Sequence, residues 1–326
     1  MKRLRPLLIS WEALLVILLL LSIVIGSVLS PFFLSGFNFD QLTSNIMEIA
    51  IMALPMTLII IVGEIDLSVA SVLGLASVVL GFVWEGQHLL WLAIGVALLV
   101  GLVAGSLNGL LVTRLGLPSL VVTIGSLALF RGLAYVVLGD RAVSDFPTSF
   151  SNFGFSTIPG TEVPWSALIF AILAVIFVVV LHFSRLGRQL YAIGNNKEAA
   201  RFAGINVGSL KLVLFVISGV IAALAGVIFT ARFSSARPDN AVGFELTVVT
   251  VVLLGGVNIF GGRGSLLGVV LAIFIVAVIQ NVMSLLNISG DIQSLVIGLL
   301  LILSVLGPNI AQRIQIAITR RRLAAG

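Results

Sequence analysis

The sequence predicts an all-α membrane protein, and its composition and hydropathy pattern lead to that class. Of its 326 residues, 60% are hydrophobic and only 10% are charged, whereas soluble chains average about 25% charged residues. The apolar residues form runs of about twenty, which as helices are long enough to cross a hydrocarbon core of about 30 Å. There is no cysteine, and histidine occurs only twice, which excludes disulfide scaffolds, cysteine-based metal sites and a histidine metal cluster. We therefore expect neither a metal nor a cofactor.

Ten membrane spans are predicted, within one polytopic membrane domain that covers residues 1–326. The apolar runs between charged or turn-rich breaks lie at about 11–30, 46–62, 67–83, 89–112, 118–138, 164–183, 210–231, 245–260, 265–287 and 291–307. Glycines crowd the end of the 245–260 run, and the runs 46–62 and 67–83 are nearly continuous. These boundaries are therefore the hardest to place.

The basic residues orient the predicted spans. With ten spans and a cytoplasmic N-terminus, most of the 18 Lys and Arg residues fall on the cytoplasmic side, as the positive-inside rule requires. Both termini are then cytoplasmic, and so is the loop at about 184–210. The net charge of +5 and the pI near 10.4 reflect this orientation, so we do not expect nucleic acid as a partner.

Two glycine-containing breaks between spans point to an internal repeat. The segments 61–67 and 253–259 match in kind when Gly63 is aligned with Gly255. Under the predicted topology both breaks are cytoplasmic and their spans run in the same direction, which predicts two parallel-type repeats. Two ordinary glycine-rich turns would look similar. The polar residues in these two breaks favour backbone that lines a cavity or packs within protein rather than facing lipid. The residues predicted to form the two cytoplasmic repeat turns are Gly63, Glu64, Asp66, Gly255, Gly256, Asn258 and Arg263.

Motifs for catalysis are missing from the sequence. It contains no H-E-x-x-H, no G-x-S-x-G and no G-x-x-x-x-G-K-[ST], so metalloprotease, serine hydrolase and nucleotide-binding interpretations have no support. We expect a protein that is not an enzyme, in which any ATP-driven work is done by a separate chain.

Polar residues inside the spans are candidates for a translocation path, because such residues usually face a bundle interior or an aqueous route. Besides Glu48, which also lies within a span, the candidates are Asn108, Arg131, Gln280 and Asn281. Two of them have a structural alternative. Asn108 lies in a stripe of small residues, Gly101, Gly105 and Gly109, which favours helix–helix hydrogen bonding, and Arg131 could form a buried structural ion pair or extend to the membrane surface.

The polar loop at 184–210 contains a short predicted helix at 197–203. Asn195 or Asn196 can cap this helix, and Gly204 ends it. Ala199, Phe202 and Ala203 share one face, with basic residues beside them. A helix of this length is not stable alone, so we predict that it docks into a groove on a partner. The alternative is an ordinary positively charged loop.

Over about residues 45–307 the sequence resembles the permease family of bacterial ATP-driven sugar importers, the ribose, xylose, rhamnose and autoinducer-2 group. Four motifs in the same order carry the resemblance: residues 63–69, Asn108-Gly109 with 118–132, 187–201 with Gly204-Ile205, and Gly255-Gly256 through 260–264. The resemblance implies a multi-pass protein of the bacterial inner membrane. It also implies three kinds of partner: a dimer of ATP-binding subunits, a second permease that is identical or related, and a periplasmic or extracellular sugar-binding protein.

The resemblance further implies that the loop couples transport to the ATP-binding subunit through Asn195, Asn196, Lys197, Glu198, Ala199, Arg201, Phe202 and Gly204. Glu64 and Ala70 depart from a pattern that often has glycine, which affects the substrate assignment more than family membership. The segments 235–239 and 255–259 look most like the rhamnose and autoinducer-2 branches. The rival interpretation is a secondary transporter driven by an ion gradient, which predicts ionisable residues deep in the spans and no docking helix.

Overall fold

The computed structural model describes residues 10–306, and within that range the protein is a helical bundle without a β-sheet. Eight helices are long and apolar enough to span a membrane: α1 (Trp11–Leu29), α2 (Gly36–Ile61), α3 (Val69–Gln87), α4 (Leu90–Thr113), α5 (Ser119–Leu138), α7 with the π-helical turn that follows it (Trp165–Phe183), α10 (Val207–Phe233) and α12 (Leu266–Leu285). Two shorter apolar helices, α11 (Phe244–Leu254) and the 290–306 helix (Gly290–Leu306), occupy the predicted spans 245–260 and 291–307. The all-helical class is thus confirmed, with eight full-length candidate spans where ten were predicted.

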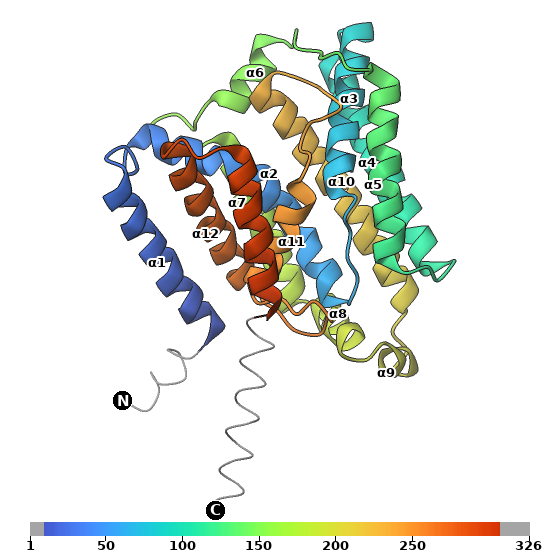
Figure 1. Cartoon of the computed structure of the whole chain (residues 1–326). Coiled ribbons are helices and arrows are strands. Elements are labelled where there is room, and N and C mark those ends of the chain that lie inside the picture. The colour runs from blue at the N-terminus through green and yellow to red at the C-terminus, as the bar shows by residue number, and fades with distance from the viewer. Residues whose placement is uncertain (1–9, 307–326) are drawn as a thin grey trace, which may run out of the picture.

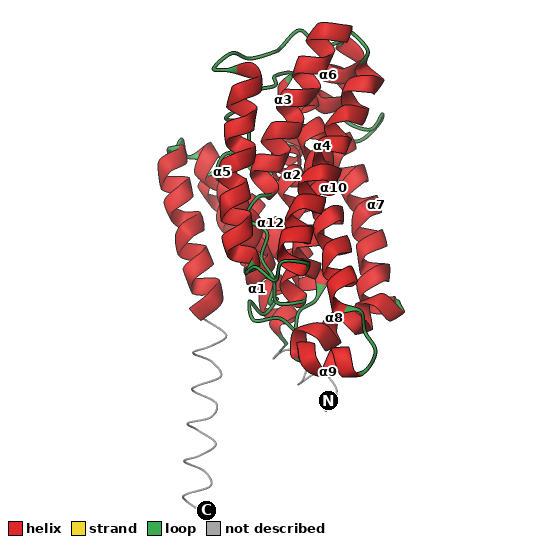
Figure 2. Cartoon of the chain, turned by 90° about the vertical axis from the view of Figure 1, so that its right-hand side faces the viewer, coloured by secondary structure: helices red, strands yellow, loops and turns green. Residues whose placement is uncertain are grey.

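The short helices mark the two ends of the bundle. Helix α6 (Thr148–Phe155) lies at one end, and α8 (Arg185–Asn195) and α9 (Lys197–Phe202) lie at the other (Figures 1 and 2). We call these the α6 end and the α9 end. The two chain termini, predicted to be cytoplasmic, lie outside the described residues.

Helix α2 forms the centre of the bundle. Every residue from Ile46 to Ile61 is buried, and α7, α8, α10, α11 and α12 all contact this helix. Helices on the periphery instead expose large apolar side chains, among them Val28 of α1, Trp91 of α4 and Val136 of α5, each at least 80% exposed. Apolar surface facing outwards on all these helices suits a protein surrounded by lipid.

Side-chain and proline caps fix where many helices begin. Ser10, Ser35, Ser184 and Ser265 each accept a hydrogen bond from a backbone N–H in the first turn of the helix that follows. Proline precedes the first residue of α5, α6 and α7. The cap at Ser35 starts α2 well before the predicted span at 46–62, and α2 therefore carries several polar residues that the predicted span left out.

The stripe of small residues on α4 packs against α10, as predicted for a close helix–helix contact. A Cβ atom added to Gly101 or Gly105 would lie 2.3 Å from the carbonyl oxygen of Gly219 or Phe215, respectively. Only hydrogen in place of a side chain allows the two backbones to approach this closely.

Candidate functional site

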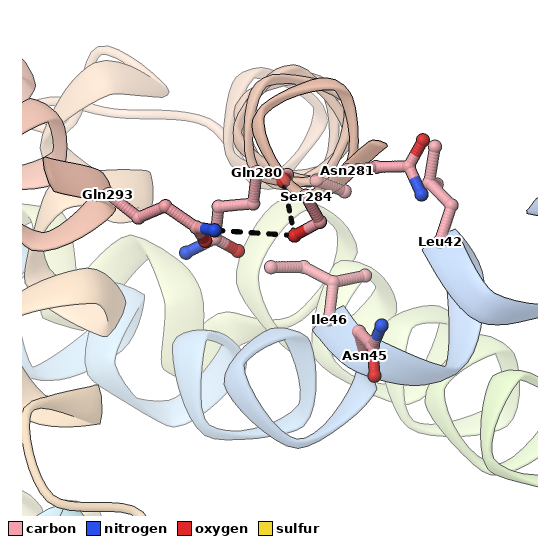
Figure 3. A pocket seen from close by; sticks show the side chains of 8 residues that line it. Leu42, Asn45, Ile46, Gln280, Asn281, Ser284 and Gln293 are labelled. Carbon is pink, nitrogen blue, oxygen red and sulfur yellow. Dashed lines mark hydrogen bonds between the residues drawn. The ribbon is translucent and has the colours of Figure 1, made fainter. Parts of the chain in front are cut away.

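A polar cavity lies between α2, α12 and the 290–306 helix (Figure 3). Its volume is about 250 Å³, and its lining consists of Leu42, Asn45, Ile46, Ala277, Gln280, Asn281, Ser284 and Gln293. A second cavity of about 210 Å³ shares Gln280 and Gln293 and reaches the start of α11, where Thr247 lines it. The lining residues come from the beginning of α2, the end of α12 and the beginning of the 290–306 helix, so the site lies towards the α6 end.

A buried ion pair holds Asn45 in the wall of the cavity. Arg232 of α10 donates two hydrogen bonds to the carboxylate of Glu48, at 2.9 and 3.2 Å, and Glu48 has no exposed surface. The same guanidinium group donates to Oδ1 of Asn45 at 2.7 Å, and it lies 4.2 Å from the centre of the Phe233 ring. The two charges neutralise each other directly behind Asn45.

The other amides of the cavity differ in how they are held. Asn281 exchanges two hydrogen bonds with Asn38, at 3.0 and 2.8 Å, so its amide is directed towards α2. Nε2 of Gln293 donates to the hydroxyl of Ser284 at 3.3 Å and to the carbonyl of Ile288 at 3.0 Å. The side chain of Gln280 extends towards Gln293 (Figure 3).

Two of the four predicted path residues, Gln280 and Asn281, thus meet in this cavity, whereas Asn108 and Arg131 lie elsewhere. Nδ2 of Asn108 donates to the hydroxyl of Ser68 at 2.8 Å, which is the helix–helix hydrogen bonding weighed as its alternative. Arg131 donates to the backbone carbonyls of Pro238, Asn240 and Ala70. It therefore bridges three segments through backbone oxygens rather than through a carboxylate.

Asp66 is the centre of a second buried polar group, at the break between α2 and α3. Its carboxylate accepts hydrogen bonds from the hydroxyl of Ser68 at 2.6 Å and from that of Ser218 at 2.9 Å. Burial raises the pKa of Asp66 above its ordinary value, although these hydrogen bonds oppose the shift. The neighbouring Glu64 forms an ion pair with Lys211 of α10.

The two glycine-rich breaks share a backbone geometry. Gly63 and Gly256 both have positive φ, at 77° and 87°, and each donates its N–H to the carbonyl three residues earlier. The next residues, Glu64 and Val257, donate to the carbonyl five residues earlier, so both helices end in a Schellman-type motif. This geometry equates Gly63 with Gly256, one residue later than the sequence alignment with Gly255.

Helix α8 packs directly on both breaks. The N–H of Gly262 donates to the carbonyl of Ile61 at 2.8 Å, and a Cβ atom on Gly194 would lie 1.9 Å from that carbonyl oxygen. Asn195 donates to the carbonyl of Gly262 at 3.3 Å, and the hydroxyl of Tyr191 donates to that of Gly264 at 2.7 Å. The breaks and the predicted coupling segment therefore form one contact region.

Side-chain and backbone hydrogen bonds also order the loop that contains Asn258 and Arg263. Asn258 donates its N–H to the carbonyl of Arg263 at 3.0 Å and accepts from the N–H of Phe260 at 2.9 Å. Gly255 packs against α12, where an added Cβ would lie 2.6 Å from Cα of Val269.

Helix α9 has the cap and the exposed ridge that the sequence predicts. Asn196 accepts hydrogen bonds from the N–H groups of Glu198 and Ala199, both at 3.0 Å, and Gly204 has φ of 82° just past the helix end. Ala200 faces inwards and is buried, whereas Phe202 is 91% exposed. The remaining ridge residues and the charged residues of the segment are also exposed; these are Lys197, Glu198, Ala199, Arg201 and Ala203.

The sequence analysis did not identify three residues that line the cavity, Asn45, Ser284 and Gln293. It also did not identify Arg232, which holds Asn45 in place. Asn45 lies just before the predicted span that begins at 46, and Arg232 lies just after the predicted span that ends at 231, although α10 continues to Phe233. The sequence feature that could have identified Asn45 is its position three residues before Glu48, which places both side chains on the same face of a helix. Gln293 lies inside the predicted span at 291–307, where its amide is the same kind of signal as that of Gln280.

No cluster of three metal-binding side chains was found within residues 10–306. No solved structure was found to match the chain. Its sequence is similar to several permeases named "Autoinducer 2 import system permease protein LsrD". That of Klebsiella pneumoniae is 35% identical over 322 residues, which cover 97% of this chain and 96% of the relative. Those of Enterobacter sp. and Yersinia enterocolitica are 34% and 35% identical, covering 93% and 82% of this chain and 94% and 82% of the relatives.

Residues 38–305 match the family described as "Branched-chain amino acid transport system / permease component". This range includes both glycine-rich breaks, the α8–α9 segment and the polar cavity. The chain therefore belongs to this family of bacterial inner-membrane, multi-pass transport permeases.

Proposed function

We propose that the protein is the permease subunit of an ATP-driven importer for a sugar-like molecule, with autoinducer-2 as the first substrate to test. The near full-length similarity to autoinducer-2 import permeases carries this proposal. The family description names branched-chain amino acids instead. A zwitterionic amino acid carries two charges that must be compensated when they leave water, and no ionisable side chain lines either cavity.

The translocation path runs past the polar cavity. Asn45 and Ser284 are exposed at the surface of this single chain, and Gln280 and Gln293 are partly exposed. Uncovered polar side chains within membrane helices are costly in contact with lipid, so this face belongs against water or against a second permease. Asn281 supports the wall through Asn38, while Asn108 and Arg131 act in helix packing.

Coupling to ATP takes place at the α9 end, which faces the cytoplasm. The ridge formed by Ala199, Phe202 and Ala203 docks on a dimer of ATP-binding subunits, and a binding protein delivers substrate at the α6 end. The exposure of Phe202 supports docking, because a large apolar side chain exposed beside charged residues is typical of an interaction site. Contacts of α8 with both breaks provide a route for motion from α9 into the bundle.

The rival function is a secondary transporter driven by an ion gradient. Such a carrier needs an ionisable group that faces the path. Among the described residues, Glu48 and Asp66 are the acids that are fully buried. Glu48 is neutralised by Arg232 and Asp66 is enclosed by hydroxyl groups, and neither lines the two cavities. This arrangement favours the ATP-driven importer.

Purification of the tagged protein from its own host in mild detergent, followed by mass spectrometry, tests the proposal. We expect an ATP-binding subunit at near-equal amounts, together with a second copy of this chain or a related permease. Repeated recovery of the intact protein alone would contradict the importer and favour the ion-driven carrier.

A further inference from the structure

The donor and acceptor pattern of the polar cavity identifies the class of ligand that it can hold. Asn45 provides the first constraint. Its partner Arg232 has only donors, so Oδ1 of Asn45 must face the guanidinium group, as the 2.7 Å hydrogen bond requires. Nδ2 then points away from Arg232, towards the space between α2 and α12 (Figure 3). The orientation of this amide is set by chemistry, and it offers two N–H groups to a ligand.

Gln293 provides the complementary constraint on the opposite wall. Its Nε2 donates to the carbonyl of Ile288, which can only accept, and to the hydroxyl of Ser284. Both amide hydrogens are therefore used, and Oε1 remains as an acceptor. Gln280 lies between them, and no hydrogen bond of its side-chain amide to another described residue was found. The cavity thus presents donors at Asn45, an acceptor at Gln293 and both functions at Gln280.

Electrostatics narrows the ligand class further. Neither cavity has an ionisable lining residue, and Arg232, the charged group that contacts Asn45, is paired with Glu48. A charged ligand would lose its hydration without gaining a counter-charge. A hydroxyl group, in contrast, both donates and accepts, and a ligand with several hydroxyls can pair with all three amides.

We propose that this cavity is a binding site for a neutral, polyhydroxylated ligand, contacted by Asn45 as donor, by Gln293 as acceptor and by Gln280 as both. The site deepens the proposed function, on which it rests. It lies towards the α6 end, where substrate would arrive under the proposed orientation. The competing use of these amides is contact with a second permease chain.

Two substitutions separate ligand binding from structure. Asn45→Asp keeps the shape and the oxygen that faces Arg232 but removes both donors from the cavity. Gln280→Met keeps the length and flexibility of the side chain and breaks no hydrogen bond described for that side chain. Ser106→Ala is the control, because within residues 10–306 the hydroxyl of Ser106 bonds only to the Leu102 carbonyl of its own helix, α4, and Ser106 lines neither cavity.

The probe is autoinducer-2 uptake into proteoliposomes that hold the purified wild-type or variant complex, with ATP and saturating binding protein. We expect uptake about tenfold slower for Asn45→Asp and for Gln280→Met, normal subunit composition in both, and the wild-type rate for Ser106→Ala. Uptake at the wild-type rate in both cavity variants would contradict the proposed binding site without contradicting the importer function. Loss of the second permease from either variant would also contradict the binding site and would indicate a subunit interface instead. A transport defect in Asn45→Asp alone would likewise contradict the binding site. If the wild-type complex transports no autoinducer-2, the proposed function fails together with the site.

Discussion

Glu48 and Arg232 show how charge is accommodated inside an apolar helix bundle. Their side chains form two hydrogen bonds, and the guanidinium group reaches Asn45 and the Phe233 ring as well. Such a pair adds little net stability compared with apolar residues, but removing one partner leaves an uncompensated buried charge. The ion pair therefore positions Asn45, and the fold requires both charged partners to be present.

Glu48→Gln is expected to destabilise the protein by about 3–5 kcal/mol, because it leaves the charge of Arg232 without a counter-charge in a buried position. The apparent unfolding temperature in detergent measures this effect. Glu85→Gln is the control, since the Glu85–Arg141 pair is about half exposed and surface pairs contribute about 0–1 kcal/mol. Equal midpoints for the two variants would show that the buried pair is dispensable.

Asp66 is expected to make stability depend on pH. Burial raises its pKa in the folded protein above the value of about 3.9 in an unfolded chain. The folded state therefore binds this proton more tightly, and the resulting stabilisation is lost as pH rises through the folded-state pKa. Asp66→Asn keeps hydrogen-bonding groups towards Ser68 and Ser218 but cannot titrate, so its unfolding midpoint should fall less steeply with rising pH. Parallel curves for the variant and the wild type would refute the assignment.

Individual functional residues could be predicted only in part. Gln280 and Asn281 were identifiable because an amide inside an apolar run is conspicuous. Whether an amide faces a cavity or a neighbouring helix depends on packing, which is why Asn108 and Arg131 were grouped with them. Asn45 and Arg232 are hydrogen-bonded to each other although they lie 187 residues apart in the sequence. No local sequence pattern can signal a contact at that separation.

The crossing of α4 and α10 depends on glycine at the point of closest approach. Gly105→Ala should destabilise the protein by about 1–3 kcal/mol, because the new methyl group would meet the Phe215 carbonyl and force the helices apart. Gly95→Ala in the same helix is a matched control, since no atom lies within 4 Å of the added Cβ. It should stabilise α4 by about 0.5–1 kcal/mol. Unfolding midpoints that shift equally in both variants would contradict the close approach.

The exposed ridge of α9 gives a prediction about coupling. Phe202→Asp should abolish substrate-stimulated ATP hydrolysis and transport without lowering the unfolding midpoint, because Phe202 is 91% exposed in this chain. Ala199→Glu should act in the same way. Phe202→Leu retains an apolar side chain and should retain most of the activity. Full coupling in a well-expressed Phe202→Asp variant would remove α9 from the mechanism.

The boundaries of the helices were harder to predict than their existence. The apolar run at 245–260 reads as a span, but α11 ends at Leu254 because Gly256 adopts positive φ and the chain turns into α12. In α2 the error was the opposite, since polar residues after the Ser35 cap concealed the first turns of a buried helix. Hydropathy measures composition, whereas caps and tertiary partners decide where a helix begins and ends.

The bundle as a whole connects the predicted coupling segment with both glycine-rich breaks through backbone contacts. Gly194 of α8 touches the end of α2 at Ile61 and the loop after α11 at Gly262, and Glu64 is paired with Lys211 at the start of α10. The ends of α2 and α11 share one motif, in which Gly63 is equivalent to Gly256, while the internal repeat stays a prediction. A movement of α9 would therefore reach both glycine-rich breaks together, which suits the alternating exposure of a central path.

The most direct test of this account is uptake of autoinducer-2 into proteoliposomes that contain the purified complex and its binding protein. The substrate and binding protein are placed on the α6 side and ATP on the α9 side, and ionophores collapse all ion gradients. We predict uptake that requires ATP hydrolysis and continues when the gradients are absent. Uptake that proceeds without ATP and stops when the ion gradients collapse would contradict the account and establish a secondary transporter.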